Sequence, residues 1–344
     1  MGEISYIARQ LYSGFGQRKA MGSFSETNLT LPYYFLLRSF LDENDLLVIL
    51  NTKRCRYHCA FCQLPENKPN FLVSGRDIEK QFEFILHEAK HALSILDRVT
   101  LSNDGSVLDA STFPTSALYS ITEAIREMRR VKTLLLETRL EFVKEDVIKK
   151  IQSLSRENLR INILTGFETL SSEIRRQILH KGETVKHFLF GLDNLEKLGL
   201  DMTCYVLYKP SPVMTDLEAY VEASSTIDFL VKESQSRNIN LEIRLNPMYI
   251  ATGSELSRSI DFSKYSPPKL TDIMRLAEEK KKICKHIYIG LSTEGLDVLG
   301  QSYSSREDFS GKLIKPILLF NSQKITRFSW EEILPAQQAK LCSQ

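Results

Sequence analysis

The sequence of 344 residues lacks a long apolar run, a strong net charge and a Gly/Ser-rich linker. A membrane-spanning helix needs about 20 apolar residues in succession, so we expect no membrane association. The stretch MGEISYIARQLYSGFGQRK has no apolar segment of the kind found in secretory signals, and we therefore predict a cytoplasmic protein. The net charge of +2 permits a nucleic-acid partner without indicating one.

Cysteine is also scarce, and its six copies are unevenly placed. Three of them, Cys55, Cys59 and Cys62, fall within eight positions. Structural disulfides are rare in the cytosol, so clustered cysteines there indicate metal binding or redox chemistry. The other three are isolated. We expect Cys204 and Cys284 to be core thiols and Cys342 to lie in a polar tail.

Short aliphatic or β-branched runs alternate with amphipathic helical stretches along the chain. Strands are predicted at 45–50, 98–101, 132–136, 160–164, 202–207, 240–245 and 286–289, and helices at 77–96, 115–129, 144–154 and 217–234. This alternation is typical of a parallel sheet with helical crossovers. We predict an α/β fold, a partial (β/α)6-type TIM barrel. The predicted divisions are an N-terminal extension (1–40), the barrel (41–295) and a C-terminal extension (296–344).

The clustered cysteines follow the first predicted strand, which places them on the face where parallel barrels carry their catalytic residues. A structural zinc ion takes four ligands, and His58, between two of the cysteines, is poorly placed to be the fourth. Three thiolates suit a [4Fe–4S] cluster with one open iron. A zinc-bound loop and buried free thiols remain as alternatives.

The segment CRYHCAFC, from Cys55 to Cys62, resembles the C-x3-C-x-aromatic-C motif of radical S-adenosylmethionine (SAM) enzymes, with Phe61 as the aromatic residue. The resemblance implies a radical SAM core with two cofactors, a [4Fe–4S] cluster and SAM. It also implies a low-potential electron donor, a ferredoxin or flavodoxin. SAM would be cleaved to methionine and a 5′-deoxyadenosyl radical, which abstracts hydrogen from a substrate.

The same resemblance implies SAM contacts at the ends of later strands. The segment NDGS stands where the family has a double glycine and would meet the methionyl amino group: Asn103, Asp104, Gly105 and Ser106. Glu137 would bind the ribose hydroxyls, and Glu168 with Arg175 the polar end of SAM. The backbone from Asn246 to Met248 would edge the adenine.

Residues 45–290 resemble the subgroup that contains the elongator catalytic subunit, the methylthiotransferases and the archaeosine synthase radical SAM component. The likeness to the last is carried by GFET, IRR, HKG, KP and LNP, although the archaeosine proteins have a longer spacing between their first two cysteines. It implies modification of a tRNA nucleoside, with tRNA as a partner. The alternatives are a radical SAM enzyme acting on a small metabolite or peptide, and a zinc-bound scaffold without activity.

Other charged residues fall near these motifs. A basic mouth for RNA is predicted beside the cysteine loop, from Lys53, Arg54, Arg56 and Lys68. Arg139 and Lys209 follow strand ends and are further candidates for the site. Solvated helix faces are predicted for Arg176, Lys181 and the charges within 126–132 and 278–282.

Overall fold

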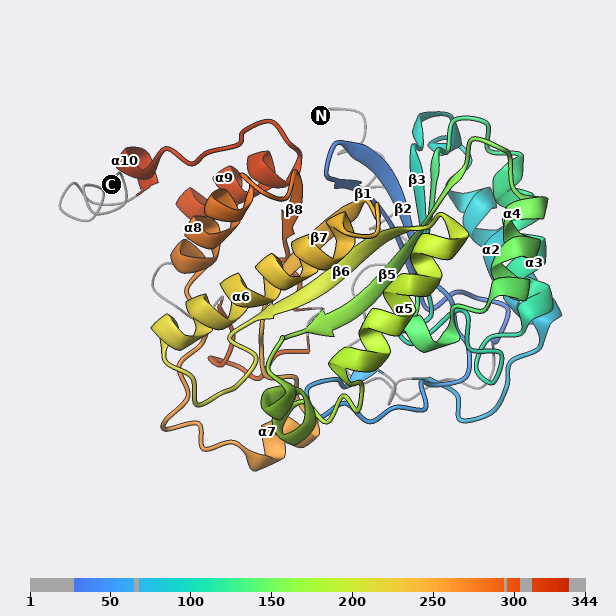
Figure 1. Ribbon diagram of the computed structural model, residues 1–344. Helices are drawn as coiled ribbons and strands as arrows, with labels where there is room; N and C mark the ends of the chain where they lie inside the picture. The colour runs from blue at the N-terminus through green and yellow to red at the C-terminus, as the bar shows by residue number, and fades with distance from the viewer. Residues whose placement is uncertain (1–27, 65–67, 294–295, 304–310, 334–344) are drawn as a thin grey trace.

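The computed structural model describes residues 28–64, 68–293, 296–303 and 311–333. Eight strands form one sheet in sequence order (Figure 1). They are β1 (Tyr34–Phe40), β2 (Glu43–Ile49), β3 (Arg98–Ser102), β4 (Thr133–Glu137), β5 (Arg160–Glu168), β6 (Asp201–Tyr208), β7 (Leu241–Pro247) and β8 (His286–Ile289). Strands β2 to β8 are parallel, and β1 pairs antiparallel with β2. The predicted α/β partial barrel is confirmed.

Helices connect the parallel strands and cover the outer side of the sheet, as α5 and α6 do beside β5 and β6 in Figure 1. The longer helices are α2 (Gly75–Glu88), α3 (Thr115–Arg126), α4 (Glu145–Leu154), α5 (Val185–Leu198), α6 (Asp216–Gln235), α8 (Leu270–Lys280) and α9 (Gly311–Asn321). Short pieces are η2 (Leu93–Ile95), η3 (Leu140–Phe142), the π-helix η4 (Ile174–Ile178), α7 (Glu255–Ser259) and α10 (Trp330–Ile333). The helix predicted at 77–96 ends at Glu88 and is followed by η2.

Local sequence signals fix several helix ends. Thr215 and Glu218 form a capping box at the start of α6, each side chain bonding the other's backbone N–H. At the end of α5, Gly199 adopts a left-handed conformation with φ of 62°, which glycine reaches without a Cβ clash. These signals set the crossover lengths and therefore the places where the chain returns to the sheet.

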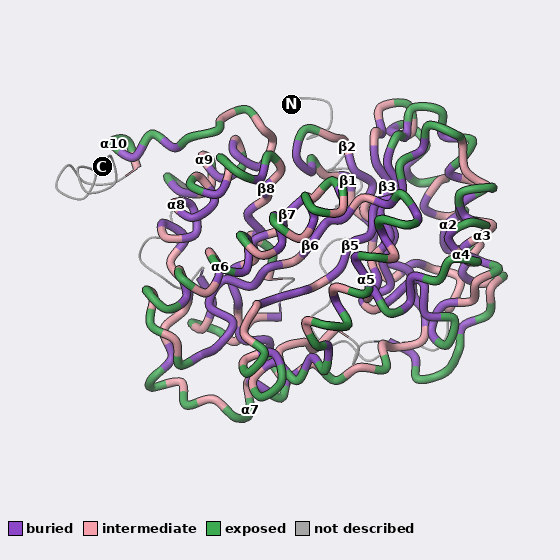
Figure 2. Tube along the Cα trace, viewed as in Figure 1, coloured by how far each residue is buried: buried purple, intermediate pink, exposed green. Residues whose placement is uncertain are grey.

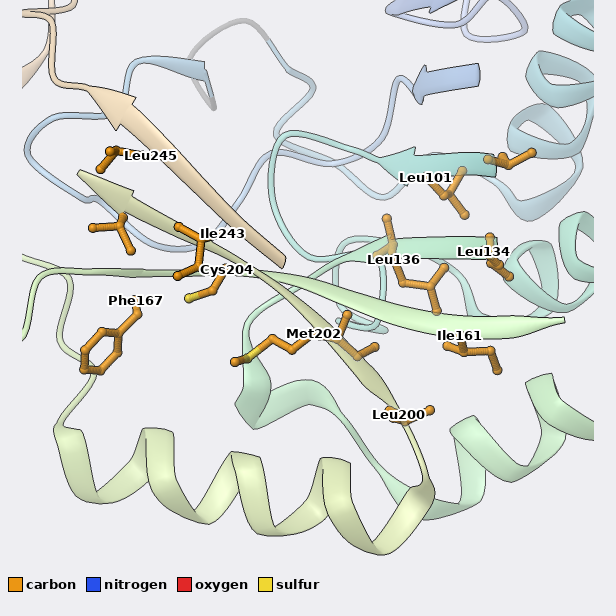
Figure 3. Close-up of a cluster of buried hydrophobic side chains, with 14 of the residues drawn as sticks. Leu101, Leu134, Leu136, Ile161, Phe167, Leu200, Met202, Cys204, Ile243 and Leu245 are labelled. Carbon is orange, nitrogen blue, oxygen red and sulfur yellow. The ribbon is translucent and has the colours of Figure 1, made fainter. Parts of the chain in front are cut away.

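The main core lies between the outer face of the sheet and the helices (Figure 3). Alternate strand residues, such as Leu134 and Leu136 on β4 and Met202 and Cys204 on β6, are buried there. Cys284 is 4% exposed and makes part of the same core. The prediction that Cys204 and Cys284 are core thiols is confirmed, whereas Cys342 lies outside the described residues.

Strand β1 was not among the predicted strands, and it falls within the segment predicted as an N-terminal extension. It brings the two edges of the sheet together, because the ring of Phe40 on β1 stacks on Tyr288 of β8 at 4.8 Å between centroids. Side chains of the first and last strands therefore contact each other, and the sheet is curled into a partial barrel.

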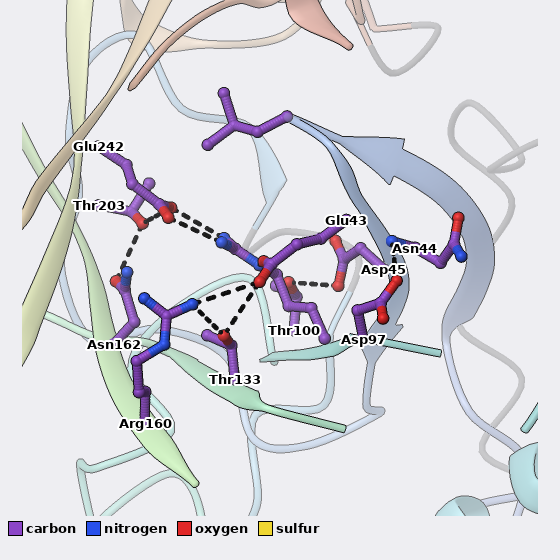
Figure 4. A network of polar contacts seen from close by, with 12 residues as sticks. Glu43, Asn44, Asp45, Asp97, Thr100, Thr133, Arg160, Asn162, Thr203 and Glu242 are labelled. Atoms are coloured by element: carbon purple, nitrogen blue, oxygen red, sulfur yellow. Dashed lines mark hydrogen bonds and ion pairs between the residues drawn. The ribbon is translucent and has the colours of Figure 1, made fainter. Parts of the chain in front are cut away.

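A polar network fills the barrel at the amino ends of the strands (Figure 4). Arg98 donates two hydrogen bonds to Glu242, at 2.8 and 2.7 Å, and its Nε bonds Glu43. Thr203 bridges Glu242 to Asn162, at 2.7 and 2.9 Å. Arg98, Glu43, Asn162 and Glu242 line a cavity of about 470 Å³ at this end of the barrel. Paired charges thus close the end that lies opposite the cysteine loop.

The strands are mostly buried, and the outward sides of the helices are exposed (Figure 2). Among the described helices, none is long and apolar enough to cross a membrane.

Candidate functional site

The cysteine loop leaves β2 and is held over the carboxyl ends of the strands by its backbone. The N–H of Ala60 donates to the carbonyl of Leu179 at 2.9 Å, and the carbonyl of Ala60 accepts from the N–H of Leu256 at 2.8 Å. One residue between the second and third cysteines is thereby tied both to the segment after η4 and to α7. The loop is fixed by residues far away in sequence.

The three loop thiols are free and partly buried. Burial raises the pKa of Cys55 to about 11, and the nearby Cys59 adds to the shift. Burial also raises the pKa of Cys59 and of Cys62. Lys181 and Arg139 act in the opposite direction on Cys55 and Cys59. Without a bound metal the thiols are therefore protonated at neutral pH, and metal binding would release these protons.

The NDGS segment after β3 packs directly against the first cysteine. A Cβ atom on Gly105 would lie 3.2 Å from Cβ and 3.6 Å from Cα of Cys55. The strained backbone is at the residue before it, since Asp104 has a φ of 56°. Close approach, rather than a left-handed turn, is thus what requires glycine at position 105.

Asn103 presents an unsatisfied acceptor at this contact. Its Nδ2 donates to Thr52 Oγ1 at 3.0 Å, whereas its buried Oδ1 has no hydrogen-bond partner among the described residues. A buried carbonyl oxygen left without a donor is costly. The position next to the cysteine loop is therefore suited to a ligand that donates a hydrogen bond.

Asp104 is neutralised within the protein. Its carboxylate lies 3.3 Å from Nζ of Lys68, and both side chains are buried. Lys68 also donates to the carbonyl of Leu50 at 2.9 Å and lies 3.9 Å from the ring centroid of Tyr33. The prediction that Lys68 contributes to an exposed basic mouth is wrong, because its ammonium ties the end of the cysteine loop to the NDGS segment.

Glu168 and Lys181 form a buried ion pair of 3.1 Å beside the cysteine loop. Gly166 makes room for it, since a Cβ there would lie 1.9 Å from Glu168 Oε1 and 3.0 Å from Lys181 Nζ. Glu168 is held with a φ of 68°. The prediction of a solvated helix face is wrong for Lys181, and also for Lys280, which is 6% exposed and bonds Asp228.

Arg175 and Glu168, predicted to bind the polar end of SAM together, do not form an ion pair with each other. Its guanidinium lies 4.2 Å from the centroid of Phe167 and donates to the carbonyls of Glu183 and Leu170, both at 3.4 Å. Burial lowers the pKa of Arg175, which is only 1% exposed. These contacts place Arg175 in the packing around η4.

Glu137 ends β4 with a partly exposed carboxylate that accepts a hydrogen bond from Ser102 Oγ. Arg139, two residues on, donates to the carbonyl of Lys181 at 3.1 Å, and its guanidinium lies 4.0 Å from the ring centroid of Tyr57. The backbone N–H of Arg139 donates to Ser106 Oγ at 3.1 Å. The ends of β3 and β4 are thus joined to the cysteine loop by polar contacts that the sequence did not reveal.

An apolar patch covers the later strand ends, where Phe61 packs against a cluster that contains Met248 and Leu207. Asn246 lies nearby on β7, and its Oδ1 occupies the space that a Cβ on Gly290 would fill, at 2.1 Å. Lys209 is buried with a φ of 64° and pairs with Asp216 at 2.9 Å. Residues predicted from separate motifs therefore line one edge of the barrel.

Comparison with known proteins agrees with this arrangement. Residues 49–213 match the family model described as the Radical SAM superfamily. An uncharacterised protein of Methanocaldococcus jannaschii is 25% identical over 286 residues, covering 81% of this chain and 76% of its own. The archaeosine synthase subunit beta of Methanosarcina acetivorans is 25% identical over 240 residues, covering 69% of this chain and 66% of its own.

Two solved structures share the fold. Spore photoproduct lyase superposes with a TM-score of 0.51 at 11% identity, covering 84% of this chain and 95% of its own. SuiB of Streptococcus suis superposes with a TM-score of 0.50 at 16% identity, covering 80% of this chain. This chain spans 53% of SuiB, about half of its length. With the family match and the position of the cysteine loop, the chain carries a radical SAM domain over residues 49–213.

Proposed function

We propose that this protein binds a [4Fe–4S] cluster through Cys55, Cys59 and Cys62, binds SAM beside it, and modifies a nucleoside of tRNA. When bound, the cluster and SAM supply a low-potential electron and a 5′-deoxyadenosyl radical that removes a hydrogen atom from the substrate. The observation that carries the proposal is the contact of Gly105 with Cys55, which sets the unsatisfied Asn103 carbonyl beside the cysteine loop.

The donor set fits these groups. No three His, Cys, Asp or Glu side chains gather closely enough to hold a single metal ion in the described ranges. In a cluster each thiolate binds its own iron, so three thiols in one loop leave the fourth iron for SAM. The amino group of SAM is a donor of the kind that Asn103 Oδ1 lacks.

The remaining proposed contacts divide by chemistry. The partly exposed Glu137 carboxylate can accept hydrogen bonds from ribose hydroxyls. Glu168 is held in position by Lys181 and would meet the polar end of SAM, whereas Arg175 would act only by shaping η4. Phe61 and Met248 give the adenine an apolar surface, and Asn246 can bond its edge. Together these residues orient SAM and limit the access of water.

The substrate class is inferred from the relatives. Two of them are archaeosine synthase beta subunits, at 25% and 23% identity. Lys53, Arg54 and Arg56 remain at least partly exposed beside the cysteine loop and could meet phosphates of a folded RNA. The electron would come from a ferredoxin or flavodoxin.

The test uses anaerobically reconstituted protein with dithionite and SAM. We expect about four irons per chain and slow formation of 5′-deoxyadenosine without substrate. Bulk tRNA should accelerate it, and nuclease treatment should abolish the acceleration. Acceleration only by the small-molecule or peptide fraction of a cell extract would replace tRNA with a small substrate. One zinc per chain and no 5′-deoxyadenosine would contradict the proposal itself.

A further inference from the structure

Three side chains form a row across the last strands of the barrel. The register pairs Tyr205 of β6 with Arg244 of β7, and Arg244 with Tyr288 of β8. Their neighbours along the strands, such as Cys204 and Ile243, point into the outer core, so the row faces the barrel interior. Arg244 therefore projects from the sheet toward the concave inner side of the partial barrel.

Aromatic rings frame the Arg244 guanidinium. Its Nη1 donates to the hydroxyl of Tyr205 at 2.9 Å. The guanidinium carbon lies 4.8, 5.5 and 5.4 Å from the ring centroids of Tyr205, Tyr288 and Phe40. Phe40 comes from β1, so the frame closes where the two edges of the sheet meet. Such contacts stabilise a cation without neutralising it.

Arg244 differs from the other arginines on the inner face. Arg98 pairs with Glu242 and Glu43, and Arg38 pairs with Asp45 at 2.7 Å. Arg244 forms no ion pair with any described residue, and its buried Nε has no hydrogen-bond partner among them. An unpaired, partly buried cation lowers stability, because desolvation is not offset by a counter-charge. A bound anion would supply the counter-charge and the hydrogen-bond acceptor that Arg244 lacks.

The position of the row relative to the cysteine loop agrees with a substrate-binding role. Gly166 pairs with Tyr205 across β5 and β6, and the Glu168–Lys181 pair lies over Gly166. Neighbouring strands are about 4.8 Å apart, so Arg244 starts about 10 Å from Gly166 along the inner wall. The unpaired cation thus lies on the same wall as the residues proposed to bind SAM.

We propose that Arg244 binds an anionic group of the substrate, a carboxylate or a phosphate, within the frame of Tyr205, Tyr288 and Phe40. The guanidinium offers two parallel N–H donors to such a group, and the rings exclude water around it. This proposal rests on the proposed function, because it names the chemical class of the substrate that the enzyme would act on. Binding of the anion itself depends on neither cluster nor SAM.

The first test therefore uses protein without cluster or SAM. The unfolding midpoint is measured in sodium phosphate, sodium acetate and sodium chloride at equal ionic strength. We expect phosphate or acetate at tens of millimolar to raise the midpoint by about 1 to 3 °C over chloride. Arg244→Gln should remove this increment. Arg275→Gln is the matched control, since Arg275 lies 5.6 Å from the Trp330 ring outside the barrel, and it should keep the increment.

The anion that acts identifies the group: phosphate alone indicates a phosphorylated substrate, and acetate alone a carboxylate. No increment over chloride with either anion would overturn the proposal. The variant's own midpoint gives a second check, because removing an unpaired cation should leave stability unchanged or raise it. A fall of more than about 5 °C in Arg244→Gln would assign Arg244 a structural role instead.

A second test uses the reconstituted protein. Arg244→Gln should form 5′-deoxyadenosine without substrate within about twofold of the wild-type rate, because it leaves the proposed SAM contacts in place. A loss of this basal reaction would show that Arg244 serves SAM and would overturn the proposal. If the wild type forms no 5′-deoxyadenosine while phosphate or acetate still stabilises it through Arg244, the proposed function fails and the anion site stands.

Discussion

The two ends of the barrel are built on opposite principles. At the amino ends of the strands, Arg98, Glu242 and Glu43 satisfy one another in a buried network. At the carboxyl ends the thiols have raised pKa values and Asn103 Oδ1 has no partner among the described residues. The polar network at the amino ends stabilises the fold. The cysteine end keeps thiols and a carbonyl oxygen that a bound metal or ligand would have to satisfy.

Backbone strain is also found at the carboxyl ends of the strands. Asp104, Glu168 and Lys209 follow or end three parallel strands, and all have positive φ angles without being glycine. Each is held by an ion pair, to Lys68, Lys181 and Asp216, and the first two of these pairs are buried. Positive φ costs energy for such residues, so the ion pairs maintain conformations that the local sequence does not favour. Strain of this kind is expected where side chains are aimed at a ligand.

The largest effect is expected at the cysteine end. Replacing Cys55, Cys59 or Cys62 by alanine should remove the iron and abolish 5′-deoxyadenosine formation, because the cluster would lose one of three ligands. Cys204→Ala and Cys284→Ala should retain both, since these thiols lie in the outer core. Iron and sulfide analysis with product chromatography measures the outcome. A core cysteine that proved essential for iron would contradict the three-ligand arrangement.

The next largest effect belongs to the network end. Arg98→Met should lower the free energy of unfolding by about 3 to 5 kcal/mol, because the buried Glu242 carboxylate would lose its cation and Glu43 would keep only Arg160. Arg160→Met is the control, since Arg160 is 52% exposed and its ion pairs should contribute less than about 1 kcal/mol. Urea denaturation measures both, and the iron content of each folded variant should match the wild type. An equal loss for the two variants would show that burial is not the cause.

Much of the fold could be predicted from the sequence because buried parallel strands read as near-continuous apolar runs. All seven predicted strands are present. Strand β1 was missed because its two-residue turn into β2 carries no glycine or asparagine, and Leu41 takes the positive φ there instead. The turn signal that marks a hairpin was absent.

The site could be predicted only where a local motif carries it. The cysteine spacing is such a motif. The burial of Lys181 is not, since it depends on Gly166 leaving space for Glu168 to fold back. The unpaired state of Arg244 depends on which side chains of β1, β6 and β8 surround it. Contacts with side chains of other strands cannot be predicted from one sequence segment.

A smaller effect is expected from the contact between the NDGS segment and the cysteine loop. Gly105→Ala adds a methyl group 3.2 Å from Cys55 Cβ, so one of the two segments must move by a few tenths of an ångström. We expect lower iron occupancy after reconstitution and a loss of stability of about 1 to 3 kcal/mol. Gly75→Ala is the control, because its methyl would meet the rotatable Ser116 hydroxyl. Full iron occupancy in Gly105→Ala would mean that the loop tolerates the displacement.

The smallest effect is a pH dependence at the network end. Burial lowers the pKa of His286, and the nearby Lys285 and Lys281 add to the shift while Glu242 opposes it. The unfolded chain therefore binds a proton at a higher pH than the folded one. The stabilising contribution of neutral His286 is present above about pH 6.5 and is lost as the pH falls through that value toward the folded pKa.

The comparison is with His286→Asn, which cannot titrate at this position. Between pH 7.5 and 5.5 the wild type should lose stability relative to the variant, by less than about 1 kcal/mol because the ring is partly exposed and screened by solvent. Urea midpoints of both proteins at each pH give the difference, and titrations elsewhere in the chain cancel. A gain for the wild type at low pH would mean that Glu242 pairs with a charged His286. The network would then contain a third cation besides Arg98 and Arg160, and Glu242 would be held both from β3 and from β8.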